Sequence, residues 1–352
     1  MHRDRAMLVE GGIGHQSARV TVATARLLHA AGVHVEVLSW NPLSLAGSTR
    51  AVSRVVRLPD AETAAESFAD VSRDRLVLPT SDAAALGLSL PGSGLVDKRA
   101  LYAHARERGV PVPATDVYPD AESLRAAAGS LAYPVILKPA IGKPVIRARS
   151  AADVEPFLRR VQPATAIVVQ AVLHGRVRAV AGVARAGALL GVVHQVAIRG
   201  WPSASGTTTA AVTTAPDLAL EALTAALVFD HDGIFHAQFL DGNVLDLNLR
   251  PYGSIALAAA AGLNLPALCA APDAHGSDEP IRGRPGVRYR WIEADIRLAV
   301  ARIRRSPGQT LSIAWEHRPR PGTAHGDAST VRDLGPAFGR LRLGRSHSRG
   351  QP

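Results

Sequence analysis

The first hundred residues alternate short apolar runs with longer amphipathic stretches. Residues 6–10 form an apolar run that predicts a strand, and the helix that follows is expected to end at Gly32. Residues 33–38 and 75–78 predict further strands. Strands that alternate with helices in this way are typical of an α/β domain built on a parallel sheet.

A loop with Gly11, Gly12 and Gly14 joins the first predicted strand to its helix, and Ser17 is the expected cap of that helix. A dinucleotide fingerprint also needs an acidic residue at the end of the second strand, whereas Glu36 lies inside that strand. We therefore favour a structural role for the loop over nucleotide binding.

A lysine interrupts an apolar strand in the middle of the chain. Residues 98–108 and 121–128 predict helices, and residues 133–140 predict a buried strand that carries Lys138. A buried amine is unfavourable without a partner, and the alternative is an amine at the strand end that extends to water. Only three of the 40 basic residues are lysines, so one retained in an apolar strand favours a functional role.

Residues 233–254 predict a hairpin, because two alternating apolar segments flank the turn sequence Asp241-Gly242-Asn243. Side chains two apart on one strand share a face, and the partner strand can add one from across the pair. Four polar side chains would then lie together: Gln238, Asp246, Asn248 and Arg250. Oxygen ligands beside an arginine suit Mg²⁺ bridged to nucleotide phosphates, although an exposed polar hairpin face would show the same pattern.

Composition favours a packed globular protein and excludes several function classes. The 352 residues are 47% apolar, and the single cysteine, Cys269, excludes an internal disulfide or a thiolate zinc site. The uncharged residues 251–272 predict a buried helix and a turn rather than a membrane span. The first residues lack the apolar core of a signal peptide, so we expect a cytoplasmic protein without a membrane partner.

Net charge is +10, and residues 272–352 carry most of it, with 15 arginines against eight acidic residues. A solvated basic face explains this better than a nucleic-acid partner. The sequence also lacks the G-x-S-x-G, H-E-x-x-H and Walker motifs of other enzyme classes.

The order of these motifs resembles the ATP-grasp superfamily, in particular its carboxylate–amine ligase and carbamoyl phosphate synthetase branches. The resemblance covers about residues 1–271. Asp97-Lys98 resembles the first lysine of the family, and Val112-Pro113-Ala114-Thr115 resembles its entry to the first lobe. The strand with Lys138 resembles the one that carries the phosphate-binding lysine, and Gln170 ends a strand similar to the one that meets adenine.

The resemblance implies an α/β fold in which a Rossmann-like pre-ATP-grasp domain precedes a two-lobed α+β ATP-grasp domain. It also implies the boundaries of the parts: a pre-ATP-grasp domain at 1–96, a first lobe at 97–170, a second lobe with the metal site at 171–271, a basic C-terminal extension at 272–340 and a disordered tail at 341–352.

The activity that the resemblance implies is ATP- and Mg²⁺-dependent ligation of small molecules, in which a carboxylate becomes an acyl phosphate that an amine attacks. A homo-oligomer is compatible with this activity. The residues implied are catalytic Arg199 and Arg250, cofactor-binding Lys98, Lys138, Lys143 and Gln170, and the metal ligands Gln238, Asp246 and Asn248. Arg199 falls in a predicted loop at residues 199–209, and the alternative for it is an ordinary surface arginine.

Two departures from the family pattern keep a second function open. The loop at residues 142–149, which is glycine-rich in the family, here has one glycine together with Lys143, Arg147 and Arg149. Ala171 also stands where the family usually has an acidic residue. The alternative is a protein of this fold that binds a nucleotide or metabolite without ligation.

If the side chains of the 142–149 loop replace main-chain amides as phosphate ligands, then neutralising Lys143, Arg147 and Arg149 should weaken Mg·ATP binding. The loss should grow as ionic strength falls, because salt screens exposed charges. Neutralising three arginines of the C-terminal tail is the control, and calorimetry measures both. Equal, negligible losses in the two triple variants would show that the loop has no phosphate role.

Overall fold

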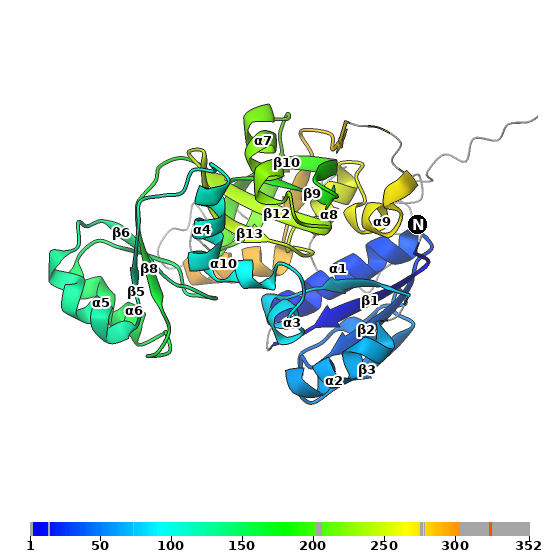
Figure 1. Ribbon diagram of the computed structural model, residues 1–352, viewed down its shortest axis with the longest axis horizontal. Coiled ribbons are helices and arrows are strands. Elements are labelled where there is room, and N and C mark those ends of the chain that lie inside the picture. Colours follow the sequence, from blue (N-terminus) through cyan, green and yellow to red (C-terminus); the bar gives the residue numbers. More distant parts are fainter. Residues whose placement is uncertain are drawn as a thin grey trace, which may run out of the picture.

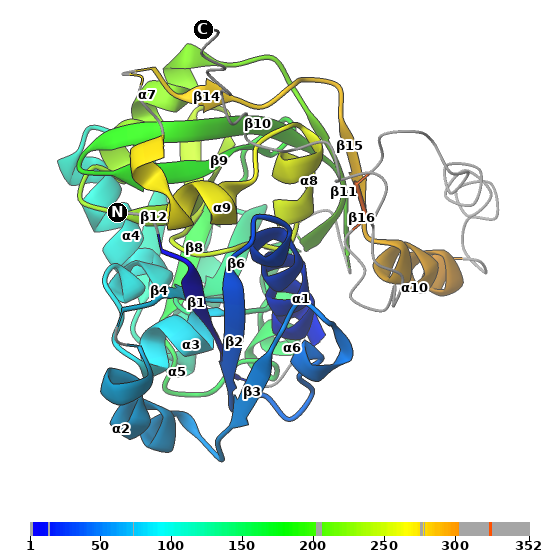
Figure 2. The same ribbon diagram turned by 90° about the vertical axis from the view of Figure 1, so that its right-hand side faces the viewer.

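A computed structural model of the chain shows three sheets, each with its own helices. It describes residues 3–12, 15–72, 74–201, 206–274, 277, 279–302 and 324–325. The first lobe projects from one side of the large second-lobe sheet, and the N-terminal domain packs below that sheet (Figure 1). A view at right angles shows the N-terminal sheet beside helices of the second lobe (Figure 2).

The N-terminal domain is a parallel sheet with strand order β3-β2-β1-β4, as the alternation of strands and helices predicts. Its elements are β1 (Arg5–Glu10), α1 (His15–Ala30), β2 (His34–Ser39), β3 (Arg54–Arg57), α2 (Ala61–Val71), β4 (Leu76–Pro79) and α3 (Asp82–Gly87). The expected capping role of Ser17 is wrong, because α1 already begins at His15. The Ser17 hydroxyl instead accepts a hydrogen bond from Asn41 Nδ2 at 3.1 Å.

The first lobe is a four-stranded antiparallel sheet with strand order β5-β8-β6-β7. Its elements are β5 (Thr115–Tyr118), α5 (Ala121–Ala127), β6 (Val135–Pro139), β7 (Ile146–Ala148), α6 (Val154–Leu158) and β8 (Ile167–Ala171). Val135 and Leu137 face the core beneath the two helices. Because side chains alternate along a strand, Lys138 and Gln170 lie on the opposite face.

The second lobe is an eight-stranded sheet in which β13-β12-β9-β10-β11-β15-β16 are neighbours and β14 pairs with β10. Its strands are β9 (Arg178–Arg185), β10 (Ala188–Trp201), β11 (Thr207–Thr213), β12 (Gly233–Leu240), β13 (Asn243–Asn248), β14 (Ile281–Arg282), β15 (Arg288–Arg290) and β16 (Ala324–His325). The predicted hairpin is β12–β13, and its turn residues Asp241 and Gly242 both have positive φ, at 50° and 73°. The predicted loop at residues 199–209 is wrong, because β10 continues to Trp201 and β11 begins at Thr207.

Helices that pack with the second-lobe sheet come from separate parts of the chain: α4 (Lys98–Glu107), α7 (Leu218–Leu227), α8 (Ile255–Ala260), α9 (Leu265–Ala270) and α10 (Ile292–Arg302). Helix α4 falls within the range 97–170 expected for the first lobe, but we group it with the second lobe because Leu101 and Tyr102 pack with Leu247 of that sheet. The single helix expected at residues 251–272 is wrong. Gly262 has φ of 98° after α8, and the Asn264 side chain caps α9 by accepting a hydrogen bond from Ala267 N. The basic extension contributes β14, β15, β16 and α10 to this lobe, and the tail at 341–352 lies outside the described residues.

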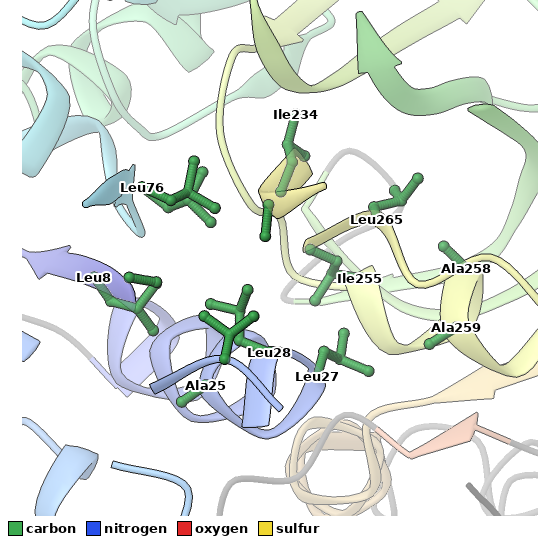
Figure 3. Packing of buried hydrophobic residues seen from close by; sticks show 14 of the residues in the cluster. Leu8, Ala25, Leu27, Leu28, Leu76, Ile234, Ile255, Ala258, Ala259 and Leu265 are labelled. Atoms are coloured by element: carbon green, nitrogen blue, oxygen red, sulfur yellow. The ribbon is translucent and has the colours of Figure 1, made fainter. Parts of the chain in front are cut away.

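One hydrophobic core joins the N-terminal domain to the second lobe. Leu8, Leu28 and Leu76 of the N-terminal domain pack in the same cluster as Ile234 and Ile255 (Figure 3). This shared core fixes the N-terminal sheet relative to the β12–β13 hairpin. Five short 3₁₀ helices complete the described fold: 46–48, 93–96, 128–130, 151–153 and 272–274. No helix in the described part of the chain has the length and apolar character that a membrane crossing requires.

The close approach of β9 and β10 depends on glycine at position 182. A Cβ atom there would lie 2.1 Å from the Gly191 carbonyl oxygen and 2.7 Å from Phe235 Cζ. Gly182→Ala should therefore destabilise the protein by about 3 kcal/mol. In the control Gly129→Ala the new Cβ meets nothing within 4 Å, so stability should change by less than about 0.5 kcal/mol. Urea unfolding measures both, and equal stabilities would contradict the packing described here.

Candidate functional site

The candidate site lies where the two lobes and the N-terminal domain meet. All three lysines of the chain interact electrostatically there, together with an arginine and two carboxylates. We call this group the lysine cluster: Lys98, Lys138, Lys143, Arg250, Asp82 and Asp246. Its members come from the first lobe, from α4 and β13 of the second lobe, and from α3 of the N-terminal domain.

Lys138 is buried at the centre of this cluster. Its side chain is on the face of β6 away from the first-lobe core, and the residue is only 5% exposed, so the alternative of an amine in water is wrong. Lys138 Nζ donates a hydrogen bond to Tyr102 Oη at 2.5 Å. Burial, helped by the charge of Lys98 and opposed by Asp246, lowers the pKa of Lys138 to about 7.

Lys98 is the first residue of α4, and two contacts position it. The Asp97 carboxylate caps the helix by accepting a hydrogen bond from Arg99 N at 2.8 Å. Lys98 N donates to Ala140 O at 2.9 Å, which ties the helix to the chain just after the Lys138 strand. These contacts bring the first two predicted lysines together.

Lys143 joins the cluster from the loop between β6 and β7. Its Nζ donates to Thr207 Oγ1 at 2.8 Å, so a first-lobe side chain contacts the start of β11 in the second lobe. Burial lowers the pKa of Lys143, while Asp246 and Asp82 act in the opposite direction. Both Lys143 and Arg147 keep much of their surface exposed, and Arg147 lies on β7.

The three predicted metal ligands lie together on the hairpin. Gln238 is directly opposite Asp246 in the strand register. Asn248 Nδ2 donates to Asp246 Oδ2 at 3.1 Å. Within the described ranges, no group of three or more His, Cys, Asp or Glu side chains could hold a metal. The hairpin nevertheless offers one carboxylate and two amide oxygens, which are hard donors of the type that Mg²⁺ takes.

Arg250 lies just beyond the end of β13 and connects the hairpin to the N-terminal domain. Its Nε donates to Asp82 Oδ1 at 2.7 Å, and its guanidinium also donates to Asn248 Oδ1 at 2.9 Å. A planar guanidinium with several fixed donors is well held by two such partners. The arginine is thereby oriented beside the metal-ligand candidates.

Gln170 and Tyr102 complete the described site, and sequence reasoning missed Tyr102. Gln170 is buried, and its Nε2 donates to Thr115 Oγ1 at 2.8 Å. Tyr102 lies in an amphipathic helix, where an aromatic residue is expected to pack in the hydrophobic core. Its position four residues after Lys98 puts both side chains on one face of the helix, which is the signal that could have identified it.

Arg199 lies in a second polar cluster. Its Nε and Nη2 donate to the two carboxylate oxygens of Asp295, at 2.9 and 2.7 Å. The Asp295 carboxylate is fully buried and also accepts from Arg290. Arg199 has a side chain only 12% exposed, so the alternative of an ordinary surface arginine is wrong.

Comparison with known proteins identifies the fold. No family model matches the chain, and no curated protein matches it significantly. The L-amino acid ligase from Bacillus licheniformis is similar in structure, at 18% identity and a TM-score of 0.58, over 82% of this chain and 79% of that one. The carboxyaminoimidazole ribonucleotide synthase from Aspergillus clavatus, complexed with ATP, matches at 17% identity and a TM-score of 0.61, over 81% of both chains.

A third similar structure is the biotin carboxylase domain of the 2-oxoglutarate carboxylase from Hydrogenobacter thermophilus, in complex with MgADP and bicarbonate. It matches at 13% identity and a TM-score of 0.56, over 82% of this chain and 74% of that one. These neighbours are ATP-grasp ligases, and their folds match most of this mixed α/β chain. The chain therefore has the ATP-grasp fold.

Proposed function

We propose that the chain is an ATP- and Mg²⁺-dependent ligase that activates a small carboxylate as an acyl phosphate for attack by an amine. The observation that carries the proposal is the lysine cluster, in which every lysine of the chain meets at the junction of the lobes of an ATP-grasp fold. The neighbours named above, an L-amino acid ligase and a synthase complexed with ATP, support the reaction class.

The charges of the cluster complement a metal-bound triphosphate. Lys98, Lys138 and Lys143 would bind the phosphate oxygens, and Gln170 would lie on the adenine side. Gln238, Asp246 and Asn248 would hold Mg²⁺, which would supply positive charge to offset that of the phosphates. Lys98 and Lys138 are buried, so little water would screen their interactions with such a ligand.

In the proposed reaction a carboxylate oxygen attacks the γ-phosphorus, the bond to the β–γ bridging oxygen breaks and ADP leaves. The amine nitrogen then attacks the acyl carbon, phosphate leaves with the electrons of its bond to that carbon, and the nitrogen loses a proton. Arg250, held by Asp82 and Asn248, would orient the phosphoryl group during transfer. The family resemblance implies that Arg199 steadies the same group, but the buried Asp295 holds its guanidinium in a separate cluster, so we assign this step to Arg250 alone.

The alternative is nucleotide or metabolite binding without ligation, which Ala171 and the composition of the 142–149 loop favour. The test measures ADP and phosphate release from Mg·ATP in the presence of panels of carboxylates and amines. Release that requires one carboxylate and one amine, with a product of their combined mass less water, supports ligation. Calorimetric binding of Mg·ATP with no phosphate release from any pair would support the alternative.

Binding of Mg·ATP should depend on pH through Lys138. The polyanion favours the ammonium form, so binding raises a pKa that is about 7 in the free protein. Below this pH the amine is already protonated, and affinity should be constant. Above it the protein must take up a proton on binding, so affinity should fall by up to about tenfold per pH unit until the pKa of the complex is reached.

Calorimetry in two buffers of different ionisation enthalpy counts that proton. Lys138→Met is the control, because it keeps an apolar stem and should bind weakly with no such pH dependence. Equal pH profiles for the two proteins would contradict the role of Lys138.

Asp246→Asn should remove most of the Mg²⁺ dependence of ATP binding while leaving the fold intact. Asparagine keeps the shape but loses the single carboxylate among the three metal-ligand candidates. The factor by which Mg²⁺ increases ATP affinity should therefore be about tenfold smaller in the variant than in the wild type. Asp116→Asn, an exposed position on β5, is the matched control. Wild-type Mg·ATP affinity in the Asp246 variant would refute the metal assignment.

A further inference from the structure

Tyr102 is a buried residue of α4 that links the two lobes by a hydrogen bond to Lys138 of the first lobe. Its side chain is on α4 in the second lobe, and the residue is 1% exposed. Its hydroxyl accepts from Lys138 Nζ of the first lobe at 2.5 Å and donates to Leu245 O of β13 at 3.0 Å. Lys138 Nζ also lies 5.1 Å from the centroid of the Tyr102 ring.

The two partners of the Tyr102 hydroxyl determine where its proton points. A main-chain carbonyl can only accept, so the single hydroxyl proton of Tyr102 points to Leu245 O. The oxygen lone pairs are then directed at Lys138, which must donate. A lysine ammonium has three N–H donors, and this contact uses one of them, so the others are available to an anionic ligand.

We propose that Tyr102 is a positioning residue for the amine of Lys138. Its hydroxyl is anchored on Leu245 O, next to Asp246 in β13, and so holds that amine beside the β12–β13 hairpin. This inference rests on the proposed function, because the position matters only if Lys138 binds phosphate. The ring fills the core beside Leu101 and Ala105, while the hydroxyl fixes where the amine lies.

Three charged or titratable groups face the Lys138 amine from the elements packed around it. Lys98 at the start of α4 repels the ammonium, Asp246 on β13 attracts it, and the Tyr102 hydroxyl accepts its hydrogen bond. Burial raises the pKa of Tyr102, so its hydroxyl stays neutral. Without that hydroxyl, burial and Lys98 act on Lys138 with only Asp246 against them, and the pKa of Lys138 should fall further.

The test compares Tyr102→Phe with Tyr133→Phe. Tyr133 is in the first lobe, and its hydroxyl, like that of Tyr102, donates to a main-chain carbonyl, that of Ala128 at 2.8 Å. Because the chain has only three lysines, a carbon-13 label at the lysine ε position gives three resolvable signals. Their pH titration in the protein without nucleotide or metal reports each amine directly.

Tyr102→Phe should lower the titration midpoint of Lys138 and weaken Mg·ATP binding at neutral pH by about tenfold, since hydrogen bonds to charged groups are the stronger ones. Tyr133→Phe should change neither. An unchanged midpoint and affinity in Tyr102→Phe would overturn the inference.

Failure of the proposed function can be told apart from failure of this inference. If the proposed function is wrong, the wild type itself does not bind Mg·ATP, but the lysine titration, which uses no nucleotide, still tests the role of Tyr102. If Tyr102→Phe does not fold, a nuclear Overhauser effect between the Lys138 ε-methylene and the Tyr102 ring in the wild type decides the contact. Its absence would overturn the inference.

Discussion

Burial of positive charge at the junction of the lobes is the constraint on which the rest of the structure depends. The lysine cluster sets four cationic side chains against two carboxylates, Asp82 and Asp246, and two of the cations, Lys98 and Lys138, are buried away from screening water. A buried amine loses much of its tendency to hold a proton, as the lowered pKa of Lys138 shows. A polyanion would restore the balance, and the Asp246 hairpin would place a divalent cation beside it.

The surrounding architecture holds the cluster in place. The core shared by α1, β1 and the second lobe fixes the N-terminal domain, and so fixes Asp82 relative to Arg250. Helix α4 starts at Lys98 and packs Leu101 and Tyr102 against the sheet that carries Asp246. Links across the lobes through Tyr102 and Thr207 then join the first lobe to this base. Each link is local, yet together they bring residues from four regions of the chain to one site.

Much of the site could be predicted because its signals are local. Period-two spacing and a favourable turn place Gln238 opposite Asp246, and an apolar strand marks Lys138. Long-range partners could not be predicted this way: Tyr102 looks like helix core, and the pairing of Asp82 with Arg250 spans 168 positions. The β10–β11 hairpin was missed because Gly200 and Pro202 are typical of loops, whereas strand pairing continues to Trp201.

The most direct test of the account uses the three lysines as probes of the intact chain. With a carbon-13 label at the lysine ε position, stepwise addition of Mg·ATP to the wild-type protein at neutral pH should shift all three signals along one saturable binding curve. The same nucleotide without Mg²⁺ should bind more weakly. Three signals that stay unmoved up to millimolar Mg·ATP would contradict the claim that the lysine cluster is a nucleotide site.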